Sequence, residues 1–151
     1  MRHMAKAKKA AGGFKHYRRK EGHYKESTIQ RSMTIESVRE GLSVKWLAKV
    51  ASELRVAERT LAEVLNISSR TFDRRLKGGV LSPTESDSLA RVARLLDRAT
   101  EIFGSVEKAR GWMSTPLAAL GGETPLQRAD TSVGAMQVDD LLGRIDYGVY
   151  S

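Results

Sequence analysis

Apolar residues recur at helical spacing along the chain from residue 34 onward, in segments bounded by glycine, proline and helix-capping residues. The segment between residues 115 and 128 differs, because its two prolines and the pair Gly121-Gly122 predict short turns. No window alternates apolar and polar residues with a period of two, and we find no internal repeat. The pattern therefore predicts an all-α protein, with helices over residues 34–40, 44–54, 57–65, 69–77, 83–103, 105–113 and 131–145.

The longest predicted helix opens at Pro83-Thr84, where Thr84 and Asp87 have the spacing of a capping box. We expect its seven apolar residues to form one buried stripe: Leu89, Val92, Ala93, Leu96, Ala99, Ile102 and Phe103. The last predicted helix carries five apolar residues: Val133, Met136, Leu141, Leu142 and Ile145. Trp112 lies within a helical stripe, and we expect it to be a core residue.

Residues 57–77 have the organisation of a helix-turn-helix, in which two short helices are joined by a tight turn. In the first helix Leu61 and Leu65 are expected to point inward, and Ile67 in the turn can fill the angle between the helices. The second helix has two apolar residues one turn apart that we expect to be buried, Phe72 and Leu76.

The outward face of this second helix is basic, because residues 68–77 hold four basic residues and one acidic residue. A recognition helix needs this layout, since its N-terminal side chains meet base edges while flanking cations hold phosphates. Arg70 is the natural reader of guanine, because a guanidinium can donate two hydrogen bonds to that base. The candidate DNA-contacting residues are Ser68, Ser69, Arg70, Thr71, Arg74, Arg75 and Lys77.

A solvated arginine face on an ordinary helical hairpin would show the same pattern, so that alternative stays open. One helix-turn-helix reads only half of a DNA site, so the DNA-binding interpretation implies a dimer.

The net charge of +8 belongs to the start of the 151-residue chain, since residues 1–25 hold nine basic residues and one glutamate. We expect residues 1–26 to be a disordered basic tail, because they have few apolar anchors. The tail is either a phosphate-binding arm or a solubilising extension. Four aromatic rings among its cations favour nucleic acid, because flat rings stack on bases: Phe14, His16, Tyr17 and Tyr24.

The chain lacks the usual side chains of catalytic and metal sites. It has no cysteine, and its three histidines, His3, His16 and His23, all lie in the basic tail. Asp139 and Asp140 point about 100° apart on a helix, so we expect solvated charges rather than metal ligands. No apolar run approaches the roughly 18 residues of a membrane span, and no signal-peptide core follows the N-terminus. We therefore expect a cytoplasmic binding protein rather than an enzyme, with no catalytic residues, cofactor, metal or membrane partner.

The C-terminal half contains a spaced pattern that helix packing alone does not explain: Trp112, Pro116, the string ALGG at 119–122, Pro125-Leu126, and YGVYS at 147–151. With NISSRTFDRRLK at 66–77, this pattern resembles the Xre/MbcA/ParS antitoxins, the partners of RES-domain toxins in bacterial type II toxin–antitoxin pairs. The resemblance runs from about Thr34 to Ser151 and leaves the first 25 or so residues outside. One departure is Ala129-Asp130, where relatives often have an apolar pair, which puts the core packing there in question.

The resemblance implies an N-terminal helix-turn-helix domain and a helical C-terminal toxin-binding domain. Charge balance changes near residues 78–84, so we expect these domains to cover 27–83 and 84–151, after the tail at 1–26. Members of the family dimerise, bind the operator DNA of their own operon, and neutralise a toxin that consumes NAD or transfers ADP-ribose. A higher hetero-oligomer with the toxin is expected.

In this family the C-terminal end reaches into or over the NAD site of the toxin. The candidate toxin-contacting residues here are Arg144, Tyr147, Gly148, Val149, Tyr150 and Ser151. Their chemistry agrees, since tyrosines are common interface anchors and a terminal carboxylate can pair with an arginine. Two alternatives remain: Val149 and Tyr150 could pack on the protein's own core, or the chain could be a stand-alone dimeric helix-turn-helix regulator.

Overall fold

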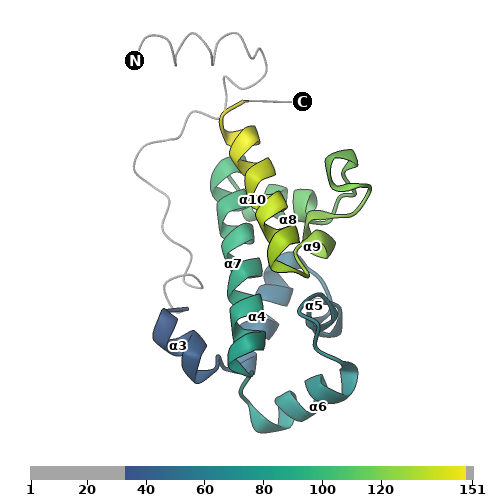
Figure 1. Cartoon of the computed structure of the whole chain (residues 1–151). Helices are drawn as coiled ribbons and strands as arrows, with labels where there is room; N and C mark the ends of the chain where they lie inside the picture. Colours follow the sequence, from purple (N-terminus) through teal and green to yellow (C-terminus); the bar gives the residue numbers. More distant parts are fainter. Residues whose placement is uncertain (1–32, 149–151) are drawn as a thin grey trace.

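The computed structural model describes residues 33–148, and within this range it contains helices, turns and loops but no β-strand (Figure 1). The helices are α3 (Ile35–Glu40), α4 (Val44–Leu54), α5 (Glu58–Val64), α6 (Ser69–Gly78), α7 (Pro83–Phe103), α8 (Val106–Met113), the 3₁₀ helix η1 (Ala118–Leu120), α9 (Pro125–Arg128) and α10 (Ser132–Asp146). The prediction of an all-α protein is confirmed for this range. The basic tail lies outside the described residues, as do Val149, Tyr150 and Ser151.

Local capping residues set most helix boundaries, which is why they could be predicted well. The Ser43 hydroxyl accepts a hydrogen bond from the Lys45 N–H and begins α4. Gly79 and Gly104 end α6 and α7 with φ angles of +77° and +86°, a conformation that favours glycine.

The start of α7 differs from the prediction that Thr84 and Asp87 form its capping box. The box is formed by Ser82 and Glu85 instead: the Ser82 hydroxyl accepts from the Glu85 N–H, and the Glu85 carboxylate accepts from the Ser82 N–H, both at 3.1 Å. Pro83 explains the shift, because proline fits best as the first residue inside a helix and leaves the preceding residue as the cap.

The segment between α8 and α10 contains more structure than the predicted short turns. Gly121 and Gly122 do make a turn, with φ angles of +68° and +86°. Thr124 and Gln127, however, form a reciprocal capping box around Pro125, so residues 125–128 make one turn of α-helix. Pro125 thus begins a helix at a point where the sequence pattern predicts only a turn.

The long helix α7 runs through the middle of the molecule and contacts α3, α4, α8 and α10 (Figure 1). Six residues of its predicted apolar stripe are buried: Leu89, Val92, Ala93, Leu96, Ala99 and Ile102. The seventh, Phe103, is half-buried, and its ring centroid lies 5.6 Å from that of Trp112 on α8. Trp112 was expected to be a core residue, but it is only partly buried and packs against the edge of the core.

The questioned junction at Ala129-Asp130 is well packed. Ala129 is buried, and the Asp130 carbonyl accepts a hydrogen bond of 2.9 Å from the Asn66 side chain in the turn before α6. Gly134 lies so close to α9 that a Cβ there would overlap the Arg128 carbonyl oxygen. The small residues allow α9 and α10 to approach closely, so an apolar pair is not needed.

Candidate functional site

The turn between α5 and α6 is built as the helix-turn-helix pattern predicts. Leu61 and Ile67 are buried, and so is Phe72 on α6. On the outside, Arg59 of α5 forms an ion pair of 2.6 Å with Asp73 of α6, and its guanidinium lies 5.4 Å from the Phe72 ring centroid. The buried apolar residues and the Arg59–Asp73 ion pair therefore fix the angle between the two helices.

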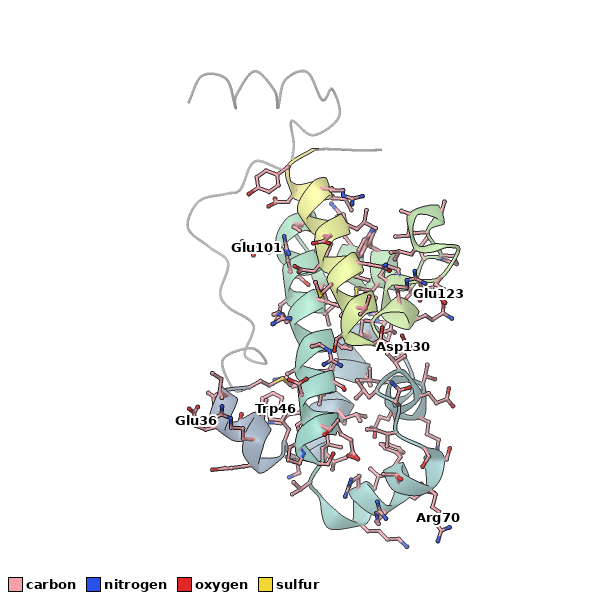
Figure 2. The ribbon with its side chains drawn as sticks, viewed as in Figure 1. Glu36, Trp46, Arg70, Glu101, Glu123 and Asp130 are labelled. Atoms are coloured by element: carbon pink, nitrogen blue, oxygen red, sulfur yellow. The ribbon has the colours of Figure 1, made fainter. Side chains whose placement is uncertain are left out.

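The N-terminus of α6 is closed by Ser68 and Thr71. The Ser68 hydroxyl accepts from the Thr71 N–H at 3.2 Å and donates to the Thr71 hydroxyl at 3.0 Å. These two candidate side chains are thus engaged in capping the helix. Ser69 and Arg70 follow on the exposed side, and Figure 2 shows Arg70 projecting from α6 away from the rest of the molecule.

The predicted basic face of α6 divides into two kinds of basic residue. Arg70, Arg74 and Lys77 are exposed and take part in no ion pair within residues 33–148. Arg75 is turned toward α7, where its guanidinium pairs with the Glu85 carboxylate, and these two side chains are only 26% and 13% exposed. No local sequence pattern indicates this pair, because Glu85 has the appearance of an ordinary residue in a first helical turn.

The prediction that Leu76 is buried beside Phe72 is wrong. Phe72 is 2% exposed, whereas Leu76 is 45% exposed. Arg59 of α5 contacts Phe72 and Asp73, in the middle of α6. The last turn of α6 extends beyond this contact, so helical spacing alone did not ensure burial.

The pKa of the Glu85 carboxylate is set by its burial and by its contacts with Arg75 and Ser82. Burial alone would raise its pKa, but hydrogen bonds from Arg75 and the Ser82 backbone, with the charge of Arg75, lower the pKa below its ordinary value.

The pKa of Glu53 on α4 shifts in the opposite direction. Burial, followed by the charge of Asp97, raises this pKa, although the charges of Lys49 and Arg110 act to lower it.

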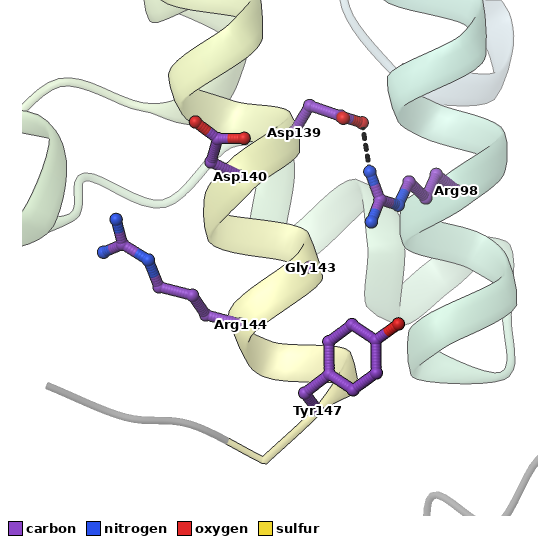
Figure 3. Close-up of a pocket in the computed structure, with 6 residues that line it drawn as sticks. All are labelled: Arg98, Asp139, Asp140, Gly143, Arg144 and Tyr147. Carbon is purple, nitrogen blue, oxygen red and sulfur yellow. Dashed lines mark ion pairs between the residues drawn. The ribbon is translucent and has the colours of Figure 1, made fainter.

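The C-terminal end of α10 forms the second candidate site, an open groove of about 480 Å³ (Figure 3). Its lining residues are Arg98, Asp139, Asp140, Gly143, Arg144 and Tyr147. Tyr147 is 66% exposed, and Gly148 follows it with a φ of +70°. Three of the six candidate toxin-contacting residues are thus described, and all three lie at the end of one helix.

Asp139 and Asp140 behave differently in this groove. Asp140 is exposed, as expected. Asp139 instead forms an ion pair of 2.5 Å with Arg98, which joins α10 to α7 (Figure 3). Gly143 makes room for this pair, because a Cβ there would lie 3.2 Å from the Arg98 guanidinium. Within residues 33–148 no group of three or more His, Cys, Asp or Glu side chains is placed to hold a metal ion.

The two candidate sites lie at opposite ends of the molecule. Figure 1 shows α6 at one end and the C-terminus of α10 at the other, with α7 between them. No helix in the described part of the chain is long and apolar enough to cross a membrane.

Comparison with known proteins assigns a domain type to each end. Residues 33–94 match the antitoxin Xre-like helix-turn-helix domain, and residues 98–148 match the antitoxin Xre/MbcA/ParS C-terminal toxin-binding domain. These two domain types are not typical of enzymes.

Curated relatives agree with the domain matches. An "Antitoxin Xre" of Yersinia enterocolitica is 34% identical over 122 residues, which cover 80% of this chain and 82% of the relative. An "Antitoxin Xre" of Photorhabdus laumondii is 35% identical over 114 residues, 74% of this chain and 77% of the relative. A "Prs ADP-ribosylating antitoxin" of a Sphingobium species is 25% identical over 138 residues, 85% of each chain. The chain therefore belongs to the Xre/MbcA/ParS family of type II antitoxins, which join a helix-turn-helix domain to a C-terminal toxin-binding domain.

Proposed function

We propose that this antitoxin neutralises a RES-domain toxin that consumes NAD or transfers ADP-ribose, by covering the toxin's NAD site with its C-terminal region. We also propose that it represses its own operon as a homodimer bound to operator DNA through α6. A protein with these two activities would act in the cytoplasm. We propose that it is a binding protein that needs no cofactor and performs no catalytic step.

The observation that carries the toxin-binding part is the exposure of Tyr147. A tyrosine that is 66% exposed stands at the end of a helix whose opposite face is buried, next to exposed Arg144. Large exposed aromatic and arginine side chains are typical anchors of protein interfaces. The chain continues from this point into Val149, Tyr150 and Ser151, which supply a second tyrosine.

The chemistry of the toxin is inferred from a relative. The Sphingobium protein carries the words "ADP-ribosylating" in its name, which supports a partner that handles NAD or ADP-ribose.

The candidate DNA-contacting residues of α6 fall into two groups, those that contact DNA and those that position the helix. Ser69, Arg70 and Arg74 are free to reach bases and phosphates, and Lys77 adds a phosphate contact at the helix end. Ser68, Thr71 and Arg75 serve by setting the start and the tilt of the helix, since their polar groups are engaged within the protein.

The separation of the two ends favours a dual role over a stand-alone regulator. With α6 and the end of α10 far apart, one chain can hold DNA and toxin at once (Figure 1). The domain boundary proposed at residues 83–84 falls at the start of α7. The two matched ranges, 33–94 and 98–148, meet within α7, so this helix contributes to both.

Co-expression tests this proposal. The full chain is produced with the RES-domain toxin from the adjacent reading frame, while growth and cellular NAD are followed. Restored growth and NAD support the proposal, and unchanged toxicity contradicts it. In parallel, a gel-shift titration of the chain on its own promoter should give a specific complex of dimer stoichiometry.

A further inference from the structure

The exposed face of α10 carries two large apolar side chains that the protein's own core does not use. Val133 is 68% exposed and Met136 is 65% exposed, among the highest values for large apolar residues within residues 33–148. Both belong to the apolar set predicted for the last helix, but the face that packs inward is a different one, made by Ala135, Val138, Leu142 and Ile145.

Helix geometry places these two residues in line with the C-terminal site. At about 100° per residue, four side chains fall within roughly 80° of one another around the axis of α10. They are Val133, Met136, Asp140 and Arg144, and we call this set the α10 stripe. Figure 3 shows Asp140 and Arg144 on the side of α10 that faces away from α7.

The composition of the α10 stripe is that of an interface rather than of an ordinary solvated face. Its first two members, Val133 and Met136, are apolar and exposed. The other two, Asp140 and Arg144, take part in no ion pair within residues 33–148, so both charges are available to a partner. Apolar patches rimmed by polar groups mark surfaces that bind other proteins.

Two observations identify the occupant as the toxin. The α10 stripe lies entirely within residues 98–148, the range that matches the toxin-binding domain. It also leads to the proposed inhibitory segment, because Arg144 is its last member and Tyr147 follows three residues later.

We propose that the α10 stripe docks the body of the toxin, so that part of the affinity comes from a surface that does not itself block the NAD site. This inference rests on the proposed function. Fourteen residues of helix separate Val133 from Tyr147, a rise of about 21 Å. The apolar end of the stripe therefore contacts toxin surface well outside the NAD site. The stripe and the C-terminal segment both contribute affinity, and only the C-terminal segment blocks the site.

The test uses two double variants of the full chain. In one, Val133→Asp is combined with Met136→Asp, and in the milder one, Val133→Ser is combined with Met136→Ser. The matched control is Ile35→Asp, because Ile35 is also 66% exposed but lies on α3, remote from α10 (Figure 1). Binding to the purified RES-domain toxin is measured by titration calorimetry, and toxin activity is measured as NAD consumption at saturating antitoxin. Thermal melts check folding, and the serine pair keeps the test valid if the aspartates disturb α10.

The aspartate pair should weaken toxin binding by about a hundredfold or more, while Ile35→Asp leaves it unchanged. Once saturated, the aspartate variant should still inhibit the toxin, because its C-terminal segment is intact. Equal affinity of all variants would overturn the proposal. A change in the oligomeric state of the antitoxin alone would also overturn it, since the face would then join two copies of this chain.

A further variant separates this inference from the proposed function. A chain that ends at Asp146 keeps the whole stripe and should still bind the toxin weakly, without inhibiting it at saturation. Inhibition by this truncated chain would contradict the proposed role of the C-terminal segment but not the docking role of the stripe.

Discussion

The guanidinium of Arg75 on α6 and the carboxylate of Glu85 on α7 form a two-pronged ion pair. The Arg75 Nε atom donates to both carboxylate oxygens, at 2.9 and 3.1 Å, and Nη2 donates to Oε1 at 3.0 Å. The same carboxylate accepts from the Ser82 N–H and closes the capping box of α7. One side chain thus fixes the end of the proposed recognition helix against the long helix that leads to the toxin-binding domain.

Replacing Glu85 with glutamine should destabilise the fold, because it removes the charge from a pair that is mostly buried and weakens a helix cap. We expect the free energy of unfolding to fall by about 1–2 kcal/mol, measured by urea denaturation. The control is Asp87→Asn, which breaks the more exposed pair between Asp87 and Arg91 and should cost about 0.5 kcal/mol or less. Equal effects of the two changes would show that the Arg75–Glu85 pair has no special structural role.

The same pair predicts a pH dependence of stability. The pKa of Glu85 is lowered in the folded protein from an ordinary value of 4.5, so its contribution is present above that value. It is lost as pH falls through the lower folded-state pKa. The stability difference between the wild type and Glu85→Gln should therefore be constant near neutral pH and shrink in acid. A difference that grows on acidification would contradict the assignment.

DNA binding should depend on the exposed arginines of α6. Arg70→Ala and Arg74→Ala should each weaken binding to the chain's own promoter by about 1–3 kcal/mol in a gel-shift titration. Arg70→Ala should also relax base preference, because a base contact carries sequence information and a phosphate contact does not. Arg94→Ala, an exposed change on α7, is the control. If both α6 variants bind like the control, α6 is not the recognition helix.

The basic N-terminal segment is expected to act on DNA rather than on the fold. Deleting residues 1–25 should leave the thermal melt nearly unchanged, because the segment offers no apolar stripe. If the segment neutralises DNA phosphates, its deletion should make the slope of log K against log salt shallower by about 0.9 per phosphate. An unchanged slope would leave solubility as its role.

The sequence was most informative where structure is decided locally. Ser43, Gly79 and Gly104 begin or end helices through interactions within one turn, so their types and positions were sufficient. The resemblance to the Xre/MbcA/ParS family was likewise carried by motifs, and the domain matches confirm it over residues 33–94 and 98–148.

Features decided by packing between helices were not predictable in this way. Glu85 lies ten residues from Arg75, and only the folded arrangement of α6 and α7 brings them together. Leu76 and Met136 are apolar and correctly spaced, yet both are exposed, because burial depends on which neighbouring helix reaches them. In α10 the exposed apolar residues are those we assign to a partner, which a single sequence does not distinguish from core.

The central claim, that the C-terminal segment is the inhibitory element, is tested most directly by a chain that ends at Asp146. This chain keeps Leu142 and Ile145, which are buried, so the core of α10 remains. It lacks Tyr147 and Tyr150, and interface anchors of this kind contribute about 2 kcal/mol or more each, so affinity should fall by roughly a thousandfold. Co-expressed with the proposed RES-domain partner toxin, the truncated antitoxin should fail to restore growth and cellular NAD, while its melt and its promoter binding stay unchanged. Full protection by the chain ending at Asp146 would contradict the account.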